Sequence, residues 1–342
     1  MIRTRTQVSL AAVLASAVVL TGCAGEDPAP SSAPGPSNSE VDALYEAALE
    51  EGSVTWYSSA PNEAPAAFEE AYPGITVDFV RLPAGQLGTR YAQERDAGAA
   101  PGDVVTIADE QFINDARDEG WIDTDLSNIP AMAEWPEDAV DDGVVTLGRA
   151  AYGIVYNTDL LSDPPATWED VLDPRFEGVI QNGDPGVVPG YLALMHVLRE
   201  EYGDEYLTEV AAMGTTYEAS QVSVTQALGA GAATLGMTGS FQLTEMLAQE
   251  GAPVKFQDMS PTTGSTFYTI ASTDSTHPNA AKLLLNFLTS AEGQTAFAAD
   301  ISSPLGVDAV PTSVPLPDGW QDYSVDEVEA AKSEILALLE LQ

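Results

Sequence analysis

Short apolar stretches with two alternating spacings follow one another along the chain from residue 41 onward. Residues 41–51 carry apolar side chains at helical intervals, and residues 53–57 form a strand-like run. The same alternation predicts helices over 61–72 and 87–97 and strands over 75–80 and 103–107. Helices that alternate with short apolar strands indicate an α/β fold with an open, largely parallel sheet.

The pattern changes after about residue 140. Six further strands are predicted, over 144–147, 153–156, 178–180, 234–237, 254–257 and 266–272. Helices are predicted over 167–172, 191–201, 205–213, 222–230, 243–249, 278–288, 291–299 and 325–339. We expect two α/β lobes, an N-lobe from residues 41–149 and 270–342 and a C-lobe from residues 150–269, with the chain crossing between them at least twice.

The N-terminal residues have the features of an export signal. Arg3 and Arg5 precede an apolar run over residues 8–20, which is too short to span a bilayer as a mature helix. A small residue at each of the two positions before Cys23 resembles a bacterial lipobox. The pattern predicts cleavage before Cys23, the only cysteine, and attachment of a lipid to its thiol. The alternative is an ordinary secretory signal with a chance cysteine.

These features predict where the protein works. Residues 1–22 are the expected signal peptide, and residues 23–40, rich in Pro, Ser and Ala, are the expected flexible tether. No later segment approaches the roughly 20 apolar residues of a membrane span. We therefore expect an exported protein that its lipid alone anchors to the outer face of the cell membrane.

Charge narrows the possible partners. The chain has 53 acidic and 12 basic residues, a formal net charge of −41. Such a surface repels phosphate backbones and anionic lipids, so we expect neither nucleic-acid binding nor membrane binding through a basic face. We expect a monomer.

The sequence lacks the usual arrangements of catalytic residues. His196 and His277 are the only histidines and are far apart, so they form no metal-binding spacing, and both are expected to be structural. No G-x-S-x-G elbow or phosphate-binding Walker loop is present. We therefore expect a protein that is not an enzyme and holds no cofactor or metal.

Several segments together resemble a known family. Residues 56–111, 151–158 (AYGIVYNT), 165–178 (PATWEDVLDPRFEG), 277–282 and 290–294 are similar to type II periplasmic solute-binding proteins of ABC importers, nearest to the branch that binds ferric iron and small anions. The resemblance implies two lobes, each a mixed sheet flanked by helices, with a ligand cleft at the hinge. It implies delivery of a small solute to ABC permease subunits. A surface receptor for signalling or adhesion on the same fold is the alternative.

The ferric ligands of that branch are mostly missing from this chain. The resemblance places the family's Glu on Glu110, its His near Pro61 and its Tyr pair within residues 238–241, where no Tyr or His stands. One carboxylate cannot hold Fe³⁺ against hydroxide, so a ferric receptor would need a different ligand set. An organic anion, a phosphoryl compound and an iron chelate remain open as ligands.

The candidate ligand contacts lie mainly where strands give way to helices. Amides at helix N-termini suit a carboxylate or phosphate, although each such residue could equally be a plain N-cap. These candidates are Ser58, Ser59, Asp184, Gln221, Thr238 and Ser240.

Charged and aromatic candidates complete the expected cleft. Arg81, at the end of a predicted strand, and Arg149, near the crossover between lobes, are the best candidates for an anion contact. Acid-rich helical settings favour surface pairing for Arg90, Arg95, Arg117 and Arg199. Glu110, after Asp109, would favour a ligand that also has a cationic or hydroxylated part. Tyr268 is a candidate wall residue.

Overall fold

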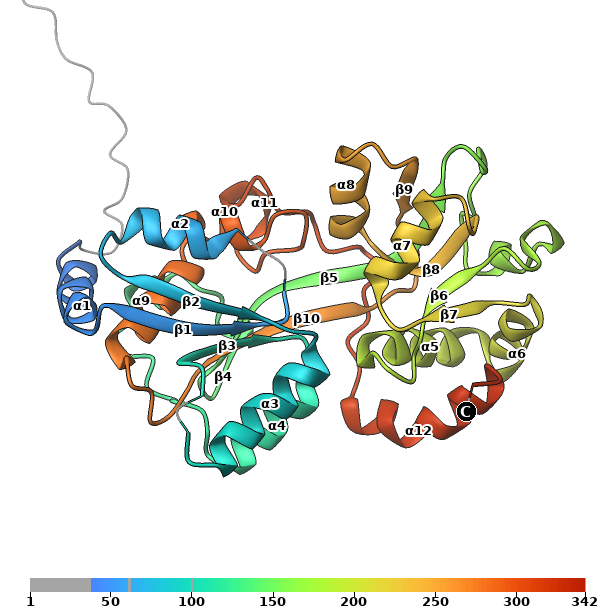
Figure 1. The fold of residues 1–342 in the computed structure, drawn as a ribbon. Coiled ribbons are helices and arrows are strands. Elements are labelled where there is room, and N and C mark those ends of the chain that lie inside the picture. Colours follow the sequence, from blue (N-terminus) through green and yellow to red (C-terminus); the bar gives the residue numbers. More distant parts are fainter. Residues whose placement is uncertain (1–37, 61–62, 100, 342) are drawn as a thin grey trace, which may run out of the picture. The chain divides into compact units, whose positions relative to one another are not determined.

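The computed structural model describes residues 38–60, 63–99 and 101–341 (Figure 1). The predicted signal peptide, Cys23 and most of the predicted tether lie outside these residues. Residues 38–40, which were expected to belong to the tether, start helix α1 (Asn38–Glu51). Within the described residues, no helix combines the length and the apolarity that a bilayer crossing needs.

The first third of the chain forms the predicted alternation of strands and helices. Three parallel strands lie in the order β2 (Thr76–Arg81), β1 (Ser53–Ser58) and β3 (Val104–Ile107). The helices that follow them in sequence are α2 (Ala64–Ala71), α3 (Ala84–Asp96) and α4 (Glu110–Asp118). Helix α4 was not predicted, although its buried Phe112, Ile113 and Ala116 have helical spacing.

Two long antiparallel strands link this region to the rest of the chain. Strand β10 (Gly264–Ala271) pairs with β3 and with β5 (Val144–Asn157). Strand β5 also pairs with three other strands, which are β4 (Val140–Asp141), β8 (Leu235–Ser240) and β9 (Val254–Gln257). Figure 1 shows β5 and β10 running side by side between the two halves of the fold.

The prediction of two separate strands over 144–147 and 153–156 is wrong, because β5 is continuous. Its middle residues carry no clear strand pattern, yet they pair with β10, with Arg149 opposite Thr266 and Ala150 opposite Ser265. Backbone pairing with a distant segment therefore extends the strand where the local pattern does not.

Besides β8, residues 181–249 form a short parallel strand pair and four helices. The pair is β6 (Gln181–Gly183) with β7 (Thr216–Glu218), and the helices are α5 (Pro189–Tyr202), α6 (Asp204–Ala212), α7 (Gln221–Gly229) and α8 (Phe241–Gln249). The strand predicted over 178–180 lies a few residues later, as β6. The helix predicted over 167–172 is only a short 3₁₀ segment, Glu169–Leu172.

Buried side chains gather in separate cores rather than in one. Trp56, Phe68 and Phe287 belong to one core, which includes residues of α9 (Pro278–Leu288) and α10 (Ala291–Phe297). A second core beneath α3 and α4 includes Tyr91. Trp168 and Val224 belong to two further cores in the second half. The fold is thus α/β and two-lobed, as predicted.

The C-terminal stretch follows a different course from the one expected. Before α11 (Gly306–Ala309), Ser302 forms a bridge to Arg149, and after it Trp320 forms a bridge to Thr262. Helix α12 (Val325–Leu338) then packs against α5 and α6, and its Ile335 is buried in their core. This packing differs from the expectation that residues 270–342 all belong to the N-lobe, because the apolar face of α12 completes the other core. The lobe boundaries otherwise stay a prediction.

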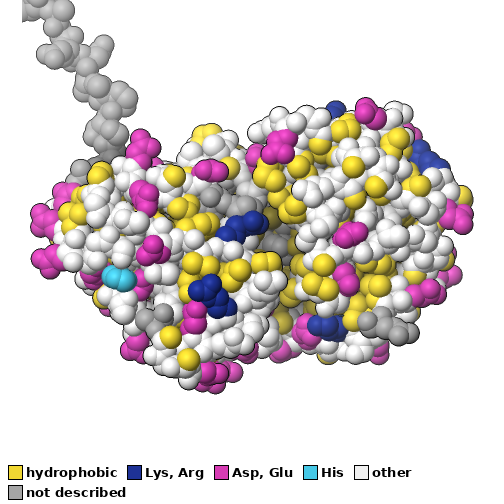
Figure 2. Space-filling model, viewed as in Figure 1, with side chains coloured by type: hydrophobic (Ala, Val, Ile, Leu, Met, Phe, Trp, Pro, Cys, Tyr) yellow, Lys and Arg dark blue, Asp and Glu magenta, His cyan; other side chains and the backbone are white. Residues whose placement is uncertain are grey.

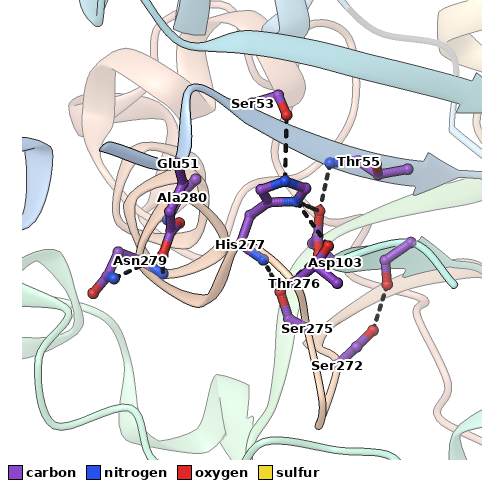
Figure 3. Close-up of polar contacts among 11 residues, drawn as sticks. Glu51, Ser53, Thr55, Asp103, Ser272, Ser275, Thr276, His277, Asn279 and Ala280 are labelled. Carbon is purple, nitrogen blue, oxygen red and sulfur yellow. Dashed lines mark hydrogen bonds and ion pairs between the residues drawn. The ribbon is translucent and has the colours of Figure 1, made fainter. Parts of the chain in front are cut away.

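One histidine connects three elements of the first lobe (Figure 3). His277 Nδ1 lies 3.0 Å from Oδ2 of Asp103, a buried carboxylate that also accepts a 2.8 Å hydrogen bond from the Thr55 amide. His277 Nε2 lies 3.5 Å from the Ser53 hydroxyl. These contacts tie β1 and the residue before β3 to the start of α9, which fits the structural role expected of His277.

Candidate functional site

A large cavity lies where several strands end and several helices begin. Its volume is about 720 Å³. Its walls come from the ends of β1 and β2, the middle of β5, the start of β10 and the first turns of α3, α5, α7 and α8. Parts of both lobes therefore surround it. This position is typical of ligand sites in α/β proteins.

Four helices begin at the cavity wall, and three of them lack a side-chain cap. The N-cap residues of α3, α5 and α8 are Pro83, Val188 and Ser240, and none of these side chains accepts a bond from the first turn in the described chain. Only α7 is capped, by Ser220, whose hydroxyl accepts from the Ser223 amide. Uncapped amide N–H groups and the helix dipole make such ends favourable for an anion.

Polar side chains on the wall are linked to one another. The Ser240 hydroxyl donates to Gln221 Oε1 at 3.2 Å, and Gln221 Nε2 donates to the Thr238 carbonyl at 2.8 Å. The Tyr152 and Ser265 hydroxyls lie 2.7 Å apart, and burial raises the pKa of Tyr152 to about 12. Tyr152 therefore stays neutral at physiological pH. These contacts hold donors and acceptors in fixed positions.

Arg81 supplies the charge of the large cavity. It ends β2, is exposed and forms no ion pair with any described residue. Arg90, Arg95, Arg117, Arg175 and Arg199 all pair with carboxylates. Of the described arginines, only Arg81 and Arg149 do not.

Carboxylates are missing from the same wall. None of the described residues that line the large cavity is Asp or Glu, although the chain has 53 of them. Figure 2 shows acidic side chains spread widely over the visible face. The large cavity is thus a cationic, donor-rich site in a strongly acidic protein.

Four of the predicted contacts line this cavity together, namely Ser59, Arg81, Gln221 and Ser240. Ser59 accepts a 3.0 Å hydrogen bond from the Ala108 amide, which leaves its hydroxyl hydrogen available to a ligand.

Three predicted contacts are instead used within the fold. Ser58 is buried and bonds to its neighbour Ala60, and Thr238 is buried and accepts a 2.7 Å bond from the Gly183 amide. The Asp184 carboxylate accepts a 2.7 Å bond from the Gly186 amide. None of the three is among the residues that line the large cavity.

The remaining predicted contacts lie in neighbouring cavities. Glu110 and Tyr268 share a smaller crevice, where the Tyr268 hydroxyl donates to Glu110 at 3.2 Å. Arg149 lines another cavity with Asp258 and Asp300, and its buried Nε has no hydrogen-bond partner among the described residues. This cavity shares Ala150 and Gln242 with the large cavity, so Arg149 lines a space that adjoins the one lined by Arg81.

Sequence reasoning missed part of the wall. Ser265 and the turn from Leu82 to Gln86 were not predicted as contacts. The sequence of this turn did indicate a possible contact, because Pro83 lies between a strand and a helix and its side chain cannot cap that helix. No local sequence pattern indicated Ser265, because its position at the cavity depends on the pairing of β10 with β5.

The described residues give little support for a bare metal site. No three His, Cys, Asp or Glu side chains among them are grouped so that they could hold a metal ion. Glu110 stands beside Tyr268 rather than beside a tyrosine pair of β8.

Comparison with known proteins supplies the family context. Residues 51–295 match the family described as bacterial extracellular solute-binding protein. Periplasmic proteins of Salmonella paratyphi A and Salmonella typhi, named for binding 2-aminoethylphosphonate, are each 29% identical over 174 residues, or 51% of this chain and 48% of theirs. The match thus spans about half the length of these relatives.

Solved structures share the fold at low sequence identity. A substrate-binding protein of an ABC transporter from Agrobacterium tumefaciens superposes with a TM-score of 0.67 at 19% identity, covering 85% of this chain and 96% of its own. AfuA from Actinobacillus pleuropneumoniae, with fructose-6-phosphate bound, gives 0.67 at 18% identity, covering 85% and 100%. Iron-bound HitA from Pseudomonas aeruginosa gives 0.66 at 17% identity, covering 84% and 98%.

Proposed function

Because the chain belongs to the family of bacterial extracellular solute-binding proteins, we propose that it captures a small anionic solute between its lobes and delivers it to an ABC importer. The observation that carries this proposal is the charge of the large cavity. Its described wall has one unpaired arginine and no carboxylate, in a chain with a net charge of −41. A cationic or neutral solute would leave Arg81 without a counter-charge.

The helix starts support an anion as well. The first turns of α3, α5, α7 and α8 contribute residues to the same wall, and α3 belongs to the other lobe from α5, α7 and α8. An anion bound there would accept hydrogen bonds from both lobes. Ligand binding would then favour the closed form of the protein, which a transporter can distinguish from the open form.

The relatives support a phosphonate or phosphoryl group as the anion. Two of them are named for 2-aminoethylphosphonate, and their match covers half of this chain. A cavity of about 720 Å³ is larger than an inorganic phosphate needs, so it suits an organic anion. Val187, Val188 and Leu243 would contact its apolar part.

The same proposal includes export and attachment. Residues 1–22 would direct export, and Cys23 would carry the lipid that holds the protein at the outer face of the membrane, beside its permease. The protein would act as a monomer and release its solute unchanged.

The test replaces the cavity arginine and a matched lysine. Arg81→Gln removes the cavity cation, and Lys255→Gln removes an exposed cation on β9 that is outside the large cavity and also has no ion pair among the described residues. Isothermal titration with 2-aminoethylphosphonate, ethylphosphonate and inorganic phosphate measures affinity. Arg81→Gln is expected to weaken the best anion by about 1.5–3 kcal/mol, a typical loss for a charged hydrogen bond.

The control and a thermal shift complete this test. Lys255→Gln is expected to bind like the wild type. An anion present at 100 times its dissociation constant should add about 2.7 kcal/mol of stability. Equal losses in the two variants would point to a general charge effect, and Arg81→Gln binding as well as the wild type would contradict the proposed site.

A further inference from the structure

A smaller crevice opens beside the large cavity. We call it the α4 crevice, and its walls come from the start of α4, from β10 and from residues 323–329 around the start of α12. It shares Ala108, Pro189 and Ser265 with the large cavity, so one ligand can extend into both. Its volume of about 40 Å³ is more than a bound water molecule or an ammonium group needs.

The two adjoining spaces have opposite charge. Arg81 is the charged residue on the described wall of the large cavity. The α4 crevice is lined by Asp109, Glu110 and Glu329, and by no Lys or Arg among the residues described. The boundary between the two spaces thus separates a cationic wall from an anionic one.

Glu110 is the carboxylate that is free to bind a ligand. Asp109 is the N-cap of α4, and its Oδ1 accepts a 3.2 Å bond from the Phe112 amide. Among the described residues, only the Tyr268 hydroxyl donates a hydrogen bond to Glu110, and burial raises the pKa of its carboxyl. Arg117, the cation that acts on it electrostatically, is paired with Asp141 at 2.6 Å. Glu110 is therefore a partly desolvated anion without a close counter-charge.

We propose that the solute is zwitterionic, with its anionic group in the large cavity beside Arg81 and its ammonium group in the α4 crevice against Glu110. This inference rests on the proposed function and names the class of solute. Tyr268 and Tyr323 are among the residues that line the same crevice, and aromatic faces attract cations. An ammonium group would give Glu110 the counter-charge that the protein does not supply.

The test compares two probes that differ by one amino group. Isothermal titration is carried out with 2-aminoethylphosphonate and with ethylphosphonate. The wild type is expected to bind the amino compound at least about tenfold more tightly, which corresponds to roughly 1.4 kcal/mol. Glu110→Gln is expected to abolish this preference and to leave ethylphosphonate binding within about twofold.

A matched variant controls for the loss of a negative charge. Asp115 lies on the same helix, is exposed and accepts a hydrogen bond from Gln111. Asp115→Asn is expected to keep the tenfold preference of the wild type. Loss of the preference in both variants would overturn the assignment to Glu110.

The failure of this inference can be told apart from that of the proposed function. If the wild type binds both probes equally, or prefers ethylphosphonate, no ammonium subsite exists and the anionic-solute function stands. If neither probe binds but another anion binds in an Arg81-dependent way, the zwitterion is again wrong and the function stands. If no anion binds at all, both the zwitterionic solute and the proposed anionic-solute function are wrong.

Discussion

Thr238 and Ser240 are hydroxyl side chains two residues apart on β8, yet they have different roles. Thr238 is fully buried and accepts the Gly183 amide, which joins β8 to β6. Ser240 donates to Gln221 at the cavity wall and leaves the first turn of α8 uncapped. Both lie at the same strand-to-helix turn, so sequence reasoning treated them alike. Their partners, which come from distant segments, separate them.

Thr238→Val tests this difference. The substitution keeps the shape of the side chain but leaves the buried Gly183 amide without an acceptor, which is expected to lower the free energy of unfolding by about 1–3 kcal/mol. Urea denaturation measures this loss. Thr238→Ser keeps the hydroxyl and should lose less stability. Anion affinity should stay within about twofold in Thr238→Val if enough protein folds; a large loss of affinity at unchanged stability would place Thr238 in the site instead.

The first turn of helix α4 contains both a residue that caps the helix and a candidate ligand contact. Asp109 caps it, and the next residue, Glu110, lies in the α4 crevice. Burial raises the pKa of both carboxyl groups. Each group therefore binds a proton more readily in the folded protein than in the unfolded chain. Their contribution to stability is present below the unfolded pKa and is lost as the pH rises through the raised pKa.

Asp109→Asn tests the direction of this pH dependence of stability. Asparagine caps a helix about as well as aspartate, so the helix is expected to form with a change in stability within about 1 kcal/mol. The difference in unfolding free energy, variant minus wild type, should increase as the pH rises from below 3.8, the ordinary pKa, and then level off above the raised pKa. Denaturation at a series of pH values measures it. A difference that stays flat or falls would show that the folded carboxyl does not titrate as the burial of Asp109 requires.

At the scale of the whole molecule, charge is the dominant feature. The chain carries a net charge of −41, and most of its few cations already pair with carboxylates. The ion pairs are mainly exposed, so each contributes little. Repulsion among the remaining carboxylates therefore opposes the compact state, and salt screens it.

Salt is expected to stabilise this protein. Raising sodium chloride from about 0.05 to 0.5 M shortens the screening distance from more than 10 Å to less than 8 Å. The melting temperature, measured by calorimetry, should rise. Potassium chloride at the same ionic strength should have the same effect, because screening depends on ionic strength. A melting temperature that falls with added salt would mean that the ion pairs outweigh the repulsion.

Much of the fold could be predicted because its signals are local. The apolar spacing of residues 41–51 and 53–57 depends only on neighbouring residues, and α1 and β1 form there. The same holds for β2, α3 and β3. Continuous β5 could not be predicted, because its middle is a strand only through its pairing with β10. Three-residue β7 is too short to show a periodic pattern.

The sequence by itself determined the α/β class, the excess of negative charge, the family resemblance and the strand-to-helix turns that supply Ser59, Arg81, Gln221 and Ser240. These properties depend on composition or on short windows of chain. Only the tertiary structure decided that Ser58 and Thr238 are buried in the fold, that Arg149 lines an adjoining cavity rather than the one lined by Arg81, and that α12 completes the second lobe. The physical reason is that a side chain's surroundings come from segments far away in sequence, which only folding brings together.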